Sequence, residues 1–119
     1  MKRKASFYIK DIIDAIEKIE EFIGNMSFGE MIQDDKTASA VLRKIEIIGE
    51  AVKQLPQNVK DRFQEILWSA MAKTRDKIIQ FYHGVDYEIV WKIVKEDLPT
   101  LKPELIRIYK ILHEEESYD

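Results

Sequence analysis

A short stretch between residues 74 and 91 holds the side chains best suited to chemistry. Arg75 and Asp76 sit side by side in a helical apolar pattern, and Gln80, Tyr82 and His83 follow soon after. An arginine carries a fixed charge that can bind a phosphate and stabilise charge that develops in a transition state. A histidine can exchange protons near neutral pH. We therefore look for a function in this stretch first.

The spacing of these residues sets a condition on the backbone. On an unbroken helix Arg75 and Tyr82 fall on nearly one line, since seven residues are close to two turns, whereas Gln80 points about 140° away from that line. A site shared by Arg75, Gln80 and Tyr82 therefore requires the helix to loosen near Gln80, or a second subunit to contribute. Gly84, just downstream, is consistent with a loosened helix end.

A purely structural interpretation of the same residues is also open. Arg75 could pair with Asp76 or with another surface acid, and Tyr82 could be a half-buried interface residue. His83 could be an ordinary residue near a helix C-terminus, where the helix dipole favours a cation. Arg75, Tyr82 and His83 do not form a nucleophile motif, and the sequence contains no Gly-rich phosphate loop. Spacing alone does not decide between the two interpretations.

Composition narrows the class of protein. The chain has 119 residues, 45% hydrophobic and 34% charged, with 4 Gly and 3 Pro, which predicts one helical domain over residues 1–119. A net charge of −3 provides no global positive field for nucleic acid, so any RNA contact must be local. The absence of Cys excludes disulfides, thiolate catalysis and Cys-based metal sites, and only His83 and His113 remain for a His site. We expect no metal or cofactor.

The first half of the chain predicts two long helices. Apolar residues at three- and four-residue steps indicate a helix over 7–23, with Ser6 as its N-cap and Gly24-Asn25 as its end. A turn or single helical turn follows, and Asp34 or Asp35 caps a second long helix over about 36–55, which Pro56 ends. Gly49 in the middle of that helix predicts the close approach of another helix. The basic N-terminus resembles neither a signal peptide nor a membrane span, so we expect a cytoplasmic protein.

The second half predicts shorter helices. One lies within 56–65, one runs from Trp68 or Ser69 through Phe81 to a stop at Gly84, and Asp86 caps the next. Leu98-Pro99 should kink or break the chain before a last amphipathic segment. We expect frayed ends over about 1–5 and 114–119. With no strand pattern and no internal repeat, the sequence predicts an all-α, up-and-down bundle of four or five helices.

Several motifs spread over nearly the whole chain, from about Ile12 to Leu105, occur here together. They are Arg75-Asp76, Tyr82, Gly84-Val85-Asp86, Trp91, Leu98-Pro99-x-Leu101, Ile47-Ile48-Gly49-Glu50-Ala51 and Trp68. In this combination the chain resembles the HepT-like branch of the HEPN superfamily. The resemblance implies a helical-bundle homodimer with a composite site where the two Arg-bearing helices meet. It also implies an RNase toxin, paired with a small nucleotidyltransferase antitoxin of the MntA type.

The family motif is Arg, four residues, His, one residue, Tyr. The resemblance makes Arg75 the catalytic arginine, Asp76 the polar residue after it, and Tyr82 the tyrosine that the antitoxin AMPylates. It implies metal-independent RNA cleavage, and Lys73 and Lys77 could then guide RNA, although a solvated helix face explains both lysines equally well. At the family's His position, however, this sequence has Gln80.

Three interpretations of Gln80 remain open. The site is naturally weakened or dead, or Gln80 is an inactivating substitution, or His83, one helical turn further on, has taken over the proton transfer. Two functional hypotheses follow. The first is a HepT-type RNase toxin, and the second is a nuclease-inactive subunit that partners a nucleotidyltransferase. In the second, Tyr82 is the AMPylation acceptor or the cleft binds a nucleotide.

Overall fold

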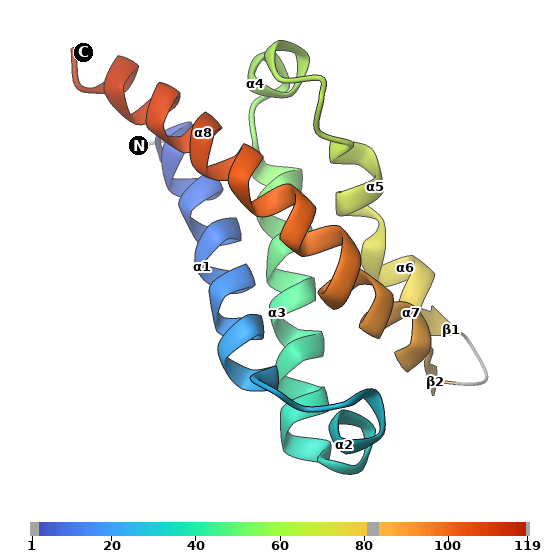
Figure 1. Cartoon of the computed structure of the whole chain (residues 1–119). Helices are drawn as coiled ribbons and strands as arrows, with labels where there is room; N and C mark the ends of the chain where they lie inside the picture. The colour runs from blue at the N-terminus through green and yellow to red at the C-terminus, as the bar shows by residue number, and fades with distance from the viewer. Residues whose placement is uncertain (1–2, 81–83, 119) are drawn as a thin grey trace.

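Three long amphipathic helices build the core of the protein. In the computed structural model, which describes residues 3–80 and 84–118, they are α1 (Ala5–Ile23), α3 (Asp35–Gln54) and α8 (Leu98–Glu116). α1 runs antiparallel beside α3, and α8 packs on α1 (Figure 1). Because their apolar side chains recur at helical spacing, each helix turns one stripe inward. The most deeply buried of these side chains are Ile9, Ile12, Ile16, Ile19, Val41, Val52, Leu105 and Ile108.

Short elements connect the long helices and form the remaining arm of the bundle. They are α2 (Phe28–Gln33), α4 (Gln57–Arg62), α5 (Trp68–Ala72), α6 (Thr74–Ile78), the strands β1 (Ile79–Gln80) and β2 (Gly84–Val85), α7 (Tyr87–Lys92) and the π-helix η1 (Ile93–Asp97). The chain runs up and down through these elements (Figure 1). The predicted all-α bundle is confirmed. Over residues 3–80 and 84–118, no helix is long and apolar enough to cross a membrane.

Local sequence signals fix several helix ends as predicted. Gly24, at a φ of 51°, follows the last residue of α1 and donates its N–H to the carbonyl of Glu20. Asp34 is the N-cap of α3, where its carboxylate accepts the backbone N–H of Thr37 at 3.2 Å. Asp86 caps α7 in the same way, accepting the N–H of Ile89 at 3.2 Å.

Gly49 lies where another helix comes close, as its position in the middle of α3 predicted. A Cβ atom placed on Gly49 would lie 3.5 Å from the carbonyl oxygen of Ala72 and 3.7 Å from that of Met71. The C-terminal end of α5 therefore rests directly on the α3 backbone. This contact attaches the α5–α6 arm to the core.

Ser6 is not the N-cap of α1, contrary to prediction. α1 begins at Ala5 with Lys4 as its cap residue, and Ser6 is completely buried. The backbone N–H of Ser6 donates to Glu116 at 3.1 Å, and its hydroxyl donates to the same carboxylate. Arg62 donates to Glu115 nearby, and α8 is helical through Glu116. These partners are distant in sequence, which is why local reasoning missed them.

Of the kink or break predicted at Leu98-Pro99, the break is absent. α7, η1 and α8 follow one another without an intervening loop, and Leu98 donates its N–H to the carbonyl of Ile93, five residues back. Pro99, the second residue of α8, has no N–H to donate to the π-turn that precedes it. The wider π-turn before it accommodates the proline ring within a continuing helix.

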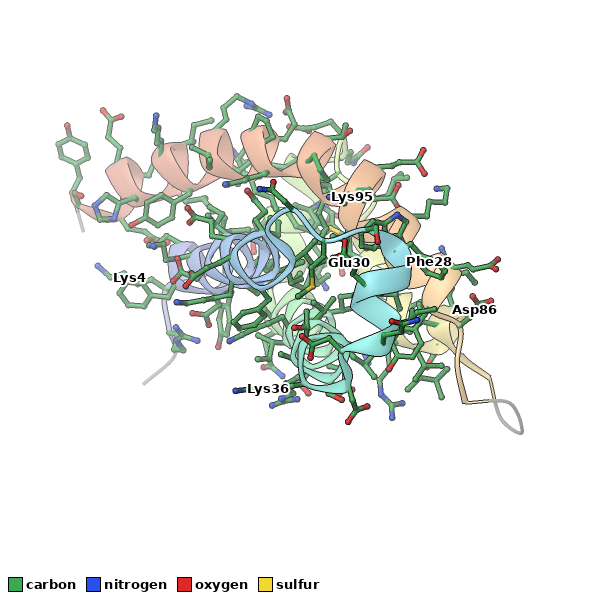
Figure 2. The ribbon with its side chains drawn as sticks, turned by 60° about the horizontal axis from the view of Figure 1, so that its bottom comes forward. Lys4, Phe28, Glu30, Lys36, Asp86 and Lys95 are labelled. Carbon is green, nitrogen blue, oxygen red and sulfur yellow. The ribbon has the colours of Figure 1, made fainter. Side chains whose placement is uncertain are left out.

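An aromatic contact attaches α2 to the α7–η1 segment. Phe28 lies where α2 adjoins α7 (Figure 2), and its ring meets that of Trp91 edge-on, with centroids 5.8 Å apart and planes at 66°. The ammonium of Lys95 lies 5.0 Å from the centre of the Trp91 ring. The Phe28–Trp91 contact therefore joins α2 to α7, and Lys95 covers the Trp91 ring from within the same helical segment.

Candidate functional site

The helix that carries Arg75 ends in a small hairpin. A continuous helix from about Trp68 to Phe81 was predicted, but the helix breaks at Lys73, and α6 ends at Ile78. β1 and β2 then pair antiparallel, with Ile79 opposite Val85 and Gln80 opposite Gly84. The predictions of one long helix and of no strands are therefore wrong here.

Local interactions explain the break and the hairpin. The hydroxyl of Thr74 donates to the carbonyl of Ala70 at 3.0 Å, a back-bond that tends to bend helices. Ile79 is extended at φ −98° and ψ 113°, a conformation that suits its β-branched side chain. Gly84 supplies a φ of 80°, and the N–H of Asp86 closes the hairpin on the carbonyl of Ile78 at 2.6 Å.

The loosening near Gln80 that a shared site would require is present. The backbone of Gln80 lies in β1 and no longer follows the helix that carries Arg75. The angle calculated for an unbroken helix therefore does not apply to Arg75 and Gln80. The side chain of Gln80 and the whole of Phe81, Tyr82 and His83 lie outside the described residues.

Arg75 differs from the other arginines in its surroundings. It is exposed on α6, and neither Arg75 nor Asp76 takes part in an ion pair within the described ranges. Every other arginine contacts at least one carboxylate: Arg3 contacts Asp11, Arg43 contacts Glu46 and Glu50, Arg62 contacts Glu115, and Arg107 contacts Glu65 and Glu104. The structural interpretation, in which Arg75 pairs with Asp76 or another surface acid, finds no support in this part of the chain.

Two further cations accompany Arg75. Lys73, at the break between α5 and α6, and Lys77, in α6, are both exposed, as is Asp76. Residues 73–77 thus contain three cationic side chains and one carboxylate, although the protein as a whole is acidic. A guanidinium without a carboxylate partner can donate paired hydrogen bonds to a phosphate. The structure therefore exposes Lys73, Arg75, Asp76 and Lys77, four of the predicted site residues, on one segment with a surplus of positive charge.

The remaining histidine is remote from this segment. His113 lies near the end of α8, where its ring stacks on that of Tyr109 with centroids 5.3 Å apart. Within residues 3–80 and 84–118, no group of three or more His, Asp or Glu side chains could hold a metal ion.

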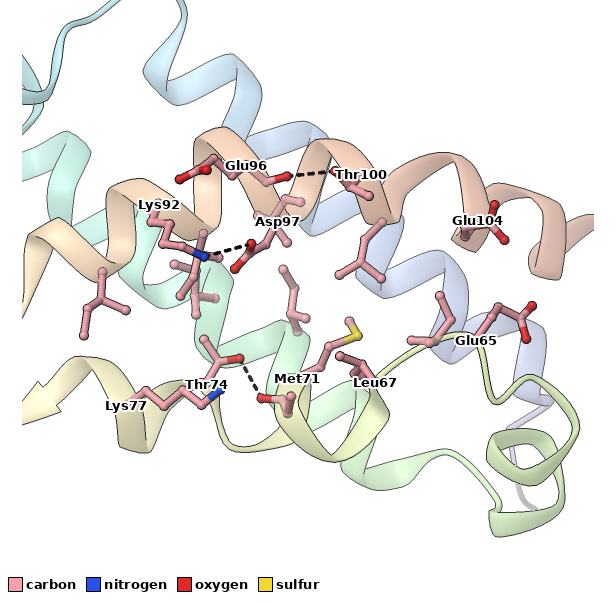
Figure 3. A pocket seen from close by; sticks show the side chains of 18 residues that line it. Glu65, Leu67, Met71, Thr74, Lys77, Lys92, Glu96, Asp97, Thr100 and Glu104 are labelled. Atoms are coloured by element: carbon pink, nitrogen blue, oxygen red, sulfur yellow. Dashed lines mark hydrogen bonds and ion pairs between the residues drawn. The ribbon is translucent and has the colours of Figure 1, made fainter.

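A groove beside α6 was not predicted from the sequence. It has a volume of about 520 Å³ and lies between the α5–α6 arm and the α7–η1–α8 helix, with Thr74 and Lys77 on its edge (Figure 3). On the α7–η1–α8 side of the groove, residues that line it lie both before and after Pro99, among them Leu98, Thr100 and Leu101. The signal was present in the sequence, but interpreting Pro99 as a break hid it.

Comparison with known protein families identifies the family of this chain. The family model described as "Ribonuclease HepT-like" matches residues 12–108, a range that includes the Arg75 segment and the hairpin. The chain belongs to the HepT-like family. The resemblance inferred from the motifs is thereby confirmed.

Several relatives of this HepT-like chain are known by name. A protein of Thermococcus cleftensis named "Probable ribonuclease HepT" is 47% identical over 110 residues, which cover 92% of this chain and 100% of the relative. A Methanocaldococcus jannaschii protein named "Putative RNase" is 37% identical over 98% of this chain and 96% of its own length. A Caldanaerobacter subterraneus protein, also named as a putative RNase, is 34% identical over 85% of this chain and 90% of its own length. Comparison with solved structures gave no significant match.

Proposed function

We propose that this HepT-like protein is an endoribonuclease whose central residue is Arg75. The observation that carries the proposal is the exposed guanidinium of Arg75, which lacks a carboxylate partner among the described residues while all the other arginines have one. The names of the T. cleftensis and M. jannaschii relatives, which describe ribonucleases, support it.

The reaction would need no metal. The 2′-hydroxyl of one nucleotide attacks the adjacent phosphorus, the bond to the 5′-oxygen breaks, and one group accepts the hydroxyl proton while another protonates the leaving oxygen. Arg75 binds the phosphate and stabilises the charge that develops on its oxygens. Lys73 and Lys77 attract the RNA backbone, and Asp76 is the polar residue that follows the arginine in the family motif. In a homodimer, two Arg75 side chains facing one cleft would concentrate positive potential in an acidic protein.

Gln80 limits the rate of this reaction. A glutamine amide can orient a phosphate or a water molecule by hydrogen bonds, but it does not exchange a proton near neutral pH. Loss of general acid–base catalysis typically lowers a rate by about 10²–10⁴-fold. We therefore propose weak or absent cleavage by this chain, unless His83 supplies the proton transfer.

The biological setting we propose is a toxin–antitoxin pair. The chain is the toxin, its partner is a small nucleotidyltransferase of the MntA type, and AMPylation of Tyr82 silences it. Adding an AMP group to Tyr82 would place a bulky negative charge seven residues after Arg75, which would compete with RNA for the guanidinium.

A second function is favoured by Gln80 alone. The protein would be a nuclease-inactive subunit that binds the nucleotidyltransferase, with Tyr82 as AMPylation acceptor or with the cleft as a nucleotide site. It would keep Arg75 as a phosphate ligand and would need no proton donor.

An RNA cleavage assay in EDTA separates the two functions. The proteins compared are this chain, its Gln80→His variant and its His83→Ala variant. Cleavage by Gln80→His alone supports a nuclease scaffold that Gln80 has disarmed. Cleavage by the unchanged chain that His83→Ala abolishes assigns proton transfer to His83. If neither the chain nor Gln80→His cleaves RNA, the nuclease proposal fails, and the result favours a nuclease-inactive subunit that binds the nucleotidyltransferase.

A further inference from the structure

The hairpin that carries Gln80 lies between two well-anchored helices. Ile78, at the end of α6, and Val90, in α7, are both 0% exposed. The hairpin itself is less anchored, because Ile79 and Val85, which pair across it, are only half-buried. Side-chain burial therefore fixes α6 and α7, whereas the place of the hairpin between them depends mainly on backbone hydrogen bonds.

Asp86 makes the hydrogen bonds that join the hairpin to both helices. Its N–H donates to the carbonyl of Ile78, the last residue of α6, at 2.6 Å. One oxygen of its carboxylate accepts the backbone N–H groups of Glu88 at 3.1 Å and Ile89 at 3.2 Å, in the first turn of α7. Figure 2 shows Asp86 where the hairpin meets α7. Asp86 thus connects the end of α6, the end of the hairpin and the start of α7.

This connection determines how Gln80 lies relative to Arg75. Arg75 is in α6, before the hairpin, and Gln80 is in β1, within it. The chain leaves α6 at Ile78 and is bonded back to the same residue through Asp86, so the backbone of Gln80 belongs to a closed loop. If that bond opened, the loop would shift while α6 stayed in place. A shift of about 1 Å between reacting groups can lower a rate by about 100-fold.

We propose that Asp86 is a positioning residue of the Arg75 site. By capping α7 and closing the hairpin on α6, it fixes the backbone of residue 80 relative to Arg75. It acts through hydrogen bonds that an uncharged acceptor can also make, so its negative charge is not required. The inference rests on the proposed nuclease function for its rate measurements, whereas the placement of the hairpin can be measured without RNA.

Asp34 provides a matched control, because it makes the same kinds of bond elsewhere in the fold. Its carboxylate caps α3 by accepting the N–H of Thr37 at 3.2 Å. Its own N–H donates to the carbonyls of Glu30 at 3.1 Å and Met31 at 3.2 Å, in α2. Like Asp86 it is half-buried, but it joins α2 to α3 rather than α6 to α7. Loss of either cap should therefore cost a similar amount of stability.

Three variants separate positioning from stability. They are Asp86→Ala, Asp86→Asn and Asp34→Ala, each made in the Gln80→His background, or in the unchanged chain if it is active. Asp86→Ala should lower kcat for RNA cleavage in EDTA by about 10–100-fold and change KM by less than about twofold, because Arg75 precedes the hairpin. Asp34→Ala should lower the melting temperature as much as Asp86→Ala does and leave kcat unchanged. Asp86→Asn should restore most of the rate, since asparagine caps helices as well as aspartate does.

Amide hydrogen exchange tests the placement of the hairpin without RNA. In the unchanged chain the N–H of residue 86 is bonded to Ile78 and should exchange slowly. Asp86→Ala should speed its exchange by about tenfold or more, whereas Asp86→Asn and Asp34→Ala should leave it nearly unchanged. If the parent protein does not cleave RNA, the nuclease proposal fails, and exchange alone decides whether Asp86 fixes the hairpin.

Four results would overturn the inference. The first is an exchange rate at residue 86 that Asp86→Ala leaves unchanged, and the second is an unchanged kcat in the same variant of an active parent. The third is an equal fall in kcat in Asp86→Ala and Asp34→Ala, because the loss would then follow stability alone. The fourth is an Asp86→Asn variant as slow as Asp86→Ala, because the charge of the carboxylate rather than its capping bonds would then be required.

Discussion

The surface arginines near the two ends of the α5–α6 arm differ in their carboxylate partners. At the end nearest α4, Arg62 donates two hydrogen bonds to Glu115, at 2.7 and 2.6 Å, and Arg107 contacts both Glu65 and Glu104. At the other end, Arg75 has no carboxylate partner in the described ranges. Paired arginines connect α8 to neighbouring segments, whereas Arg75 remains available for an anion.

The backbone of the core also differs from that of the segment that carries Arg75. α1, α3 and α8 are each about five turns long and share one isoleucine-rich core. α6 has only five residues and passes directly into two-residue strands. Long helices with buried stripes provide the stability, and the short elements are free to orient polar side chains. A change in the first region should therefore alter stability, and one in the second should alter activity.

The largest effect on stability is expected from the core. Ile16→Ala removes a side chain that is 1% exposed in α1 and leaves a cavity, which should lower the free energy of unfolding by about 2–5 kcal/mol. Lys77→Ala in α6 should change it by less than about 0.5 kcal/mol. Chemical denaturation of both variants measures the difference. Equal losses in the two would contradict the division into scaffold and site.

A smaller effect is expected where α1 meets the end of α8. Ser6→Ala removes the hydroxyl that donates to Glu116 and should lower the free energy of unfolding by about 1–2 kcal/mol. Ser39→Ala, at an exposed position of α3, is the matched control and should be nearly neutral. Thermal melting of the two variants tests this, and identical midpoints would mean that the Ser6 contact contributes nothing.

A still smaller change, in the opposite direction, is expected at Gly49. Because an added Cβ would meet the carbonyls of Ala72 and Met71 at ordinary contact distances, Gly49→Ala should raise stability by up to about 1 kcal/mol through helix propensity. Gly49→Leu should lower stability by pushing α5 away from α3. Denaturation curves of both variants show the sign, and a destabilised alanine variant would indicate a tighter contact.

The smallest effect concerns pH. Hydrogen bonds from the backbone N–H and then the hydroxyl of Ser27 hold the pKa of Glu30 below its ordinary value. A depressed pKa contributes stability above the pKa of the unfolded state and loses it as pH falls through the folded value. Glu30→Gln removes this titration, so the melting temperatures of the variant and the original should converge in acid. A constant difference at every pH would contradict this assignment.

Much of the fold followed from local signals in the sequence. The stripe of isoleucines in α1, the Asp34 and Asp86 caps and the Gly24 stop each act within a few residues, so periodicity and capping rules located them. The Ser6–Glu116 and Arg62–Glu115 contacts join residues far apart in sequence, and no local rule predicts them. Pro99 misled because the π-turn that accommodates it depends on the packing of the whole α7–η1–α8 segment.

The site was predicted in part. Residue types and the family motif singled out Arg75 and its neighbours. For a site shared with Gln80, the helical angle required either a loosened helix near Gln80 or a second subunit, and the structure has the loosened helix. The hairpin that provides the break was missed, because Ile79 and Gln80 lack a strand pattern and pair only with Val85 and Gly84. The roles of Tyr82 and His83 remain predictions.

The most direct test of the account compares two arginine variants in a protein that cleaves RNA. In the Gln80→His background, or in the unchanged chain if it is active, Arg75→Ala should slow cleavage in EDTA by about 10²–10³-fold. Arg43→Ala, which removes an exposed but paired arginine of α3, should leave the rate unchanged. Both variants should melt near the temperature of their parent. If Arg75→Ala cleaves RNA as fast as Arg43→Ala, Arg75 is not the centre of the site.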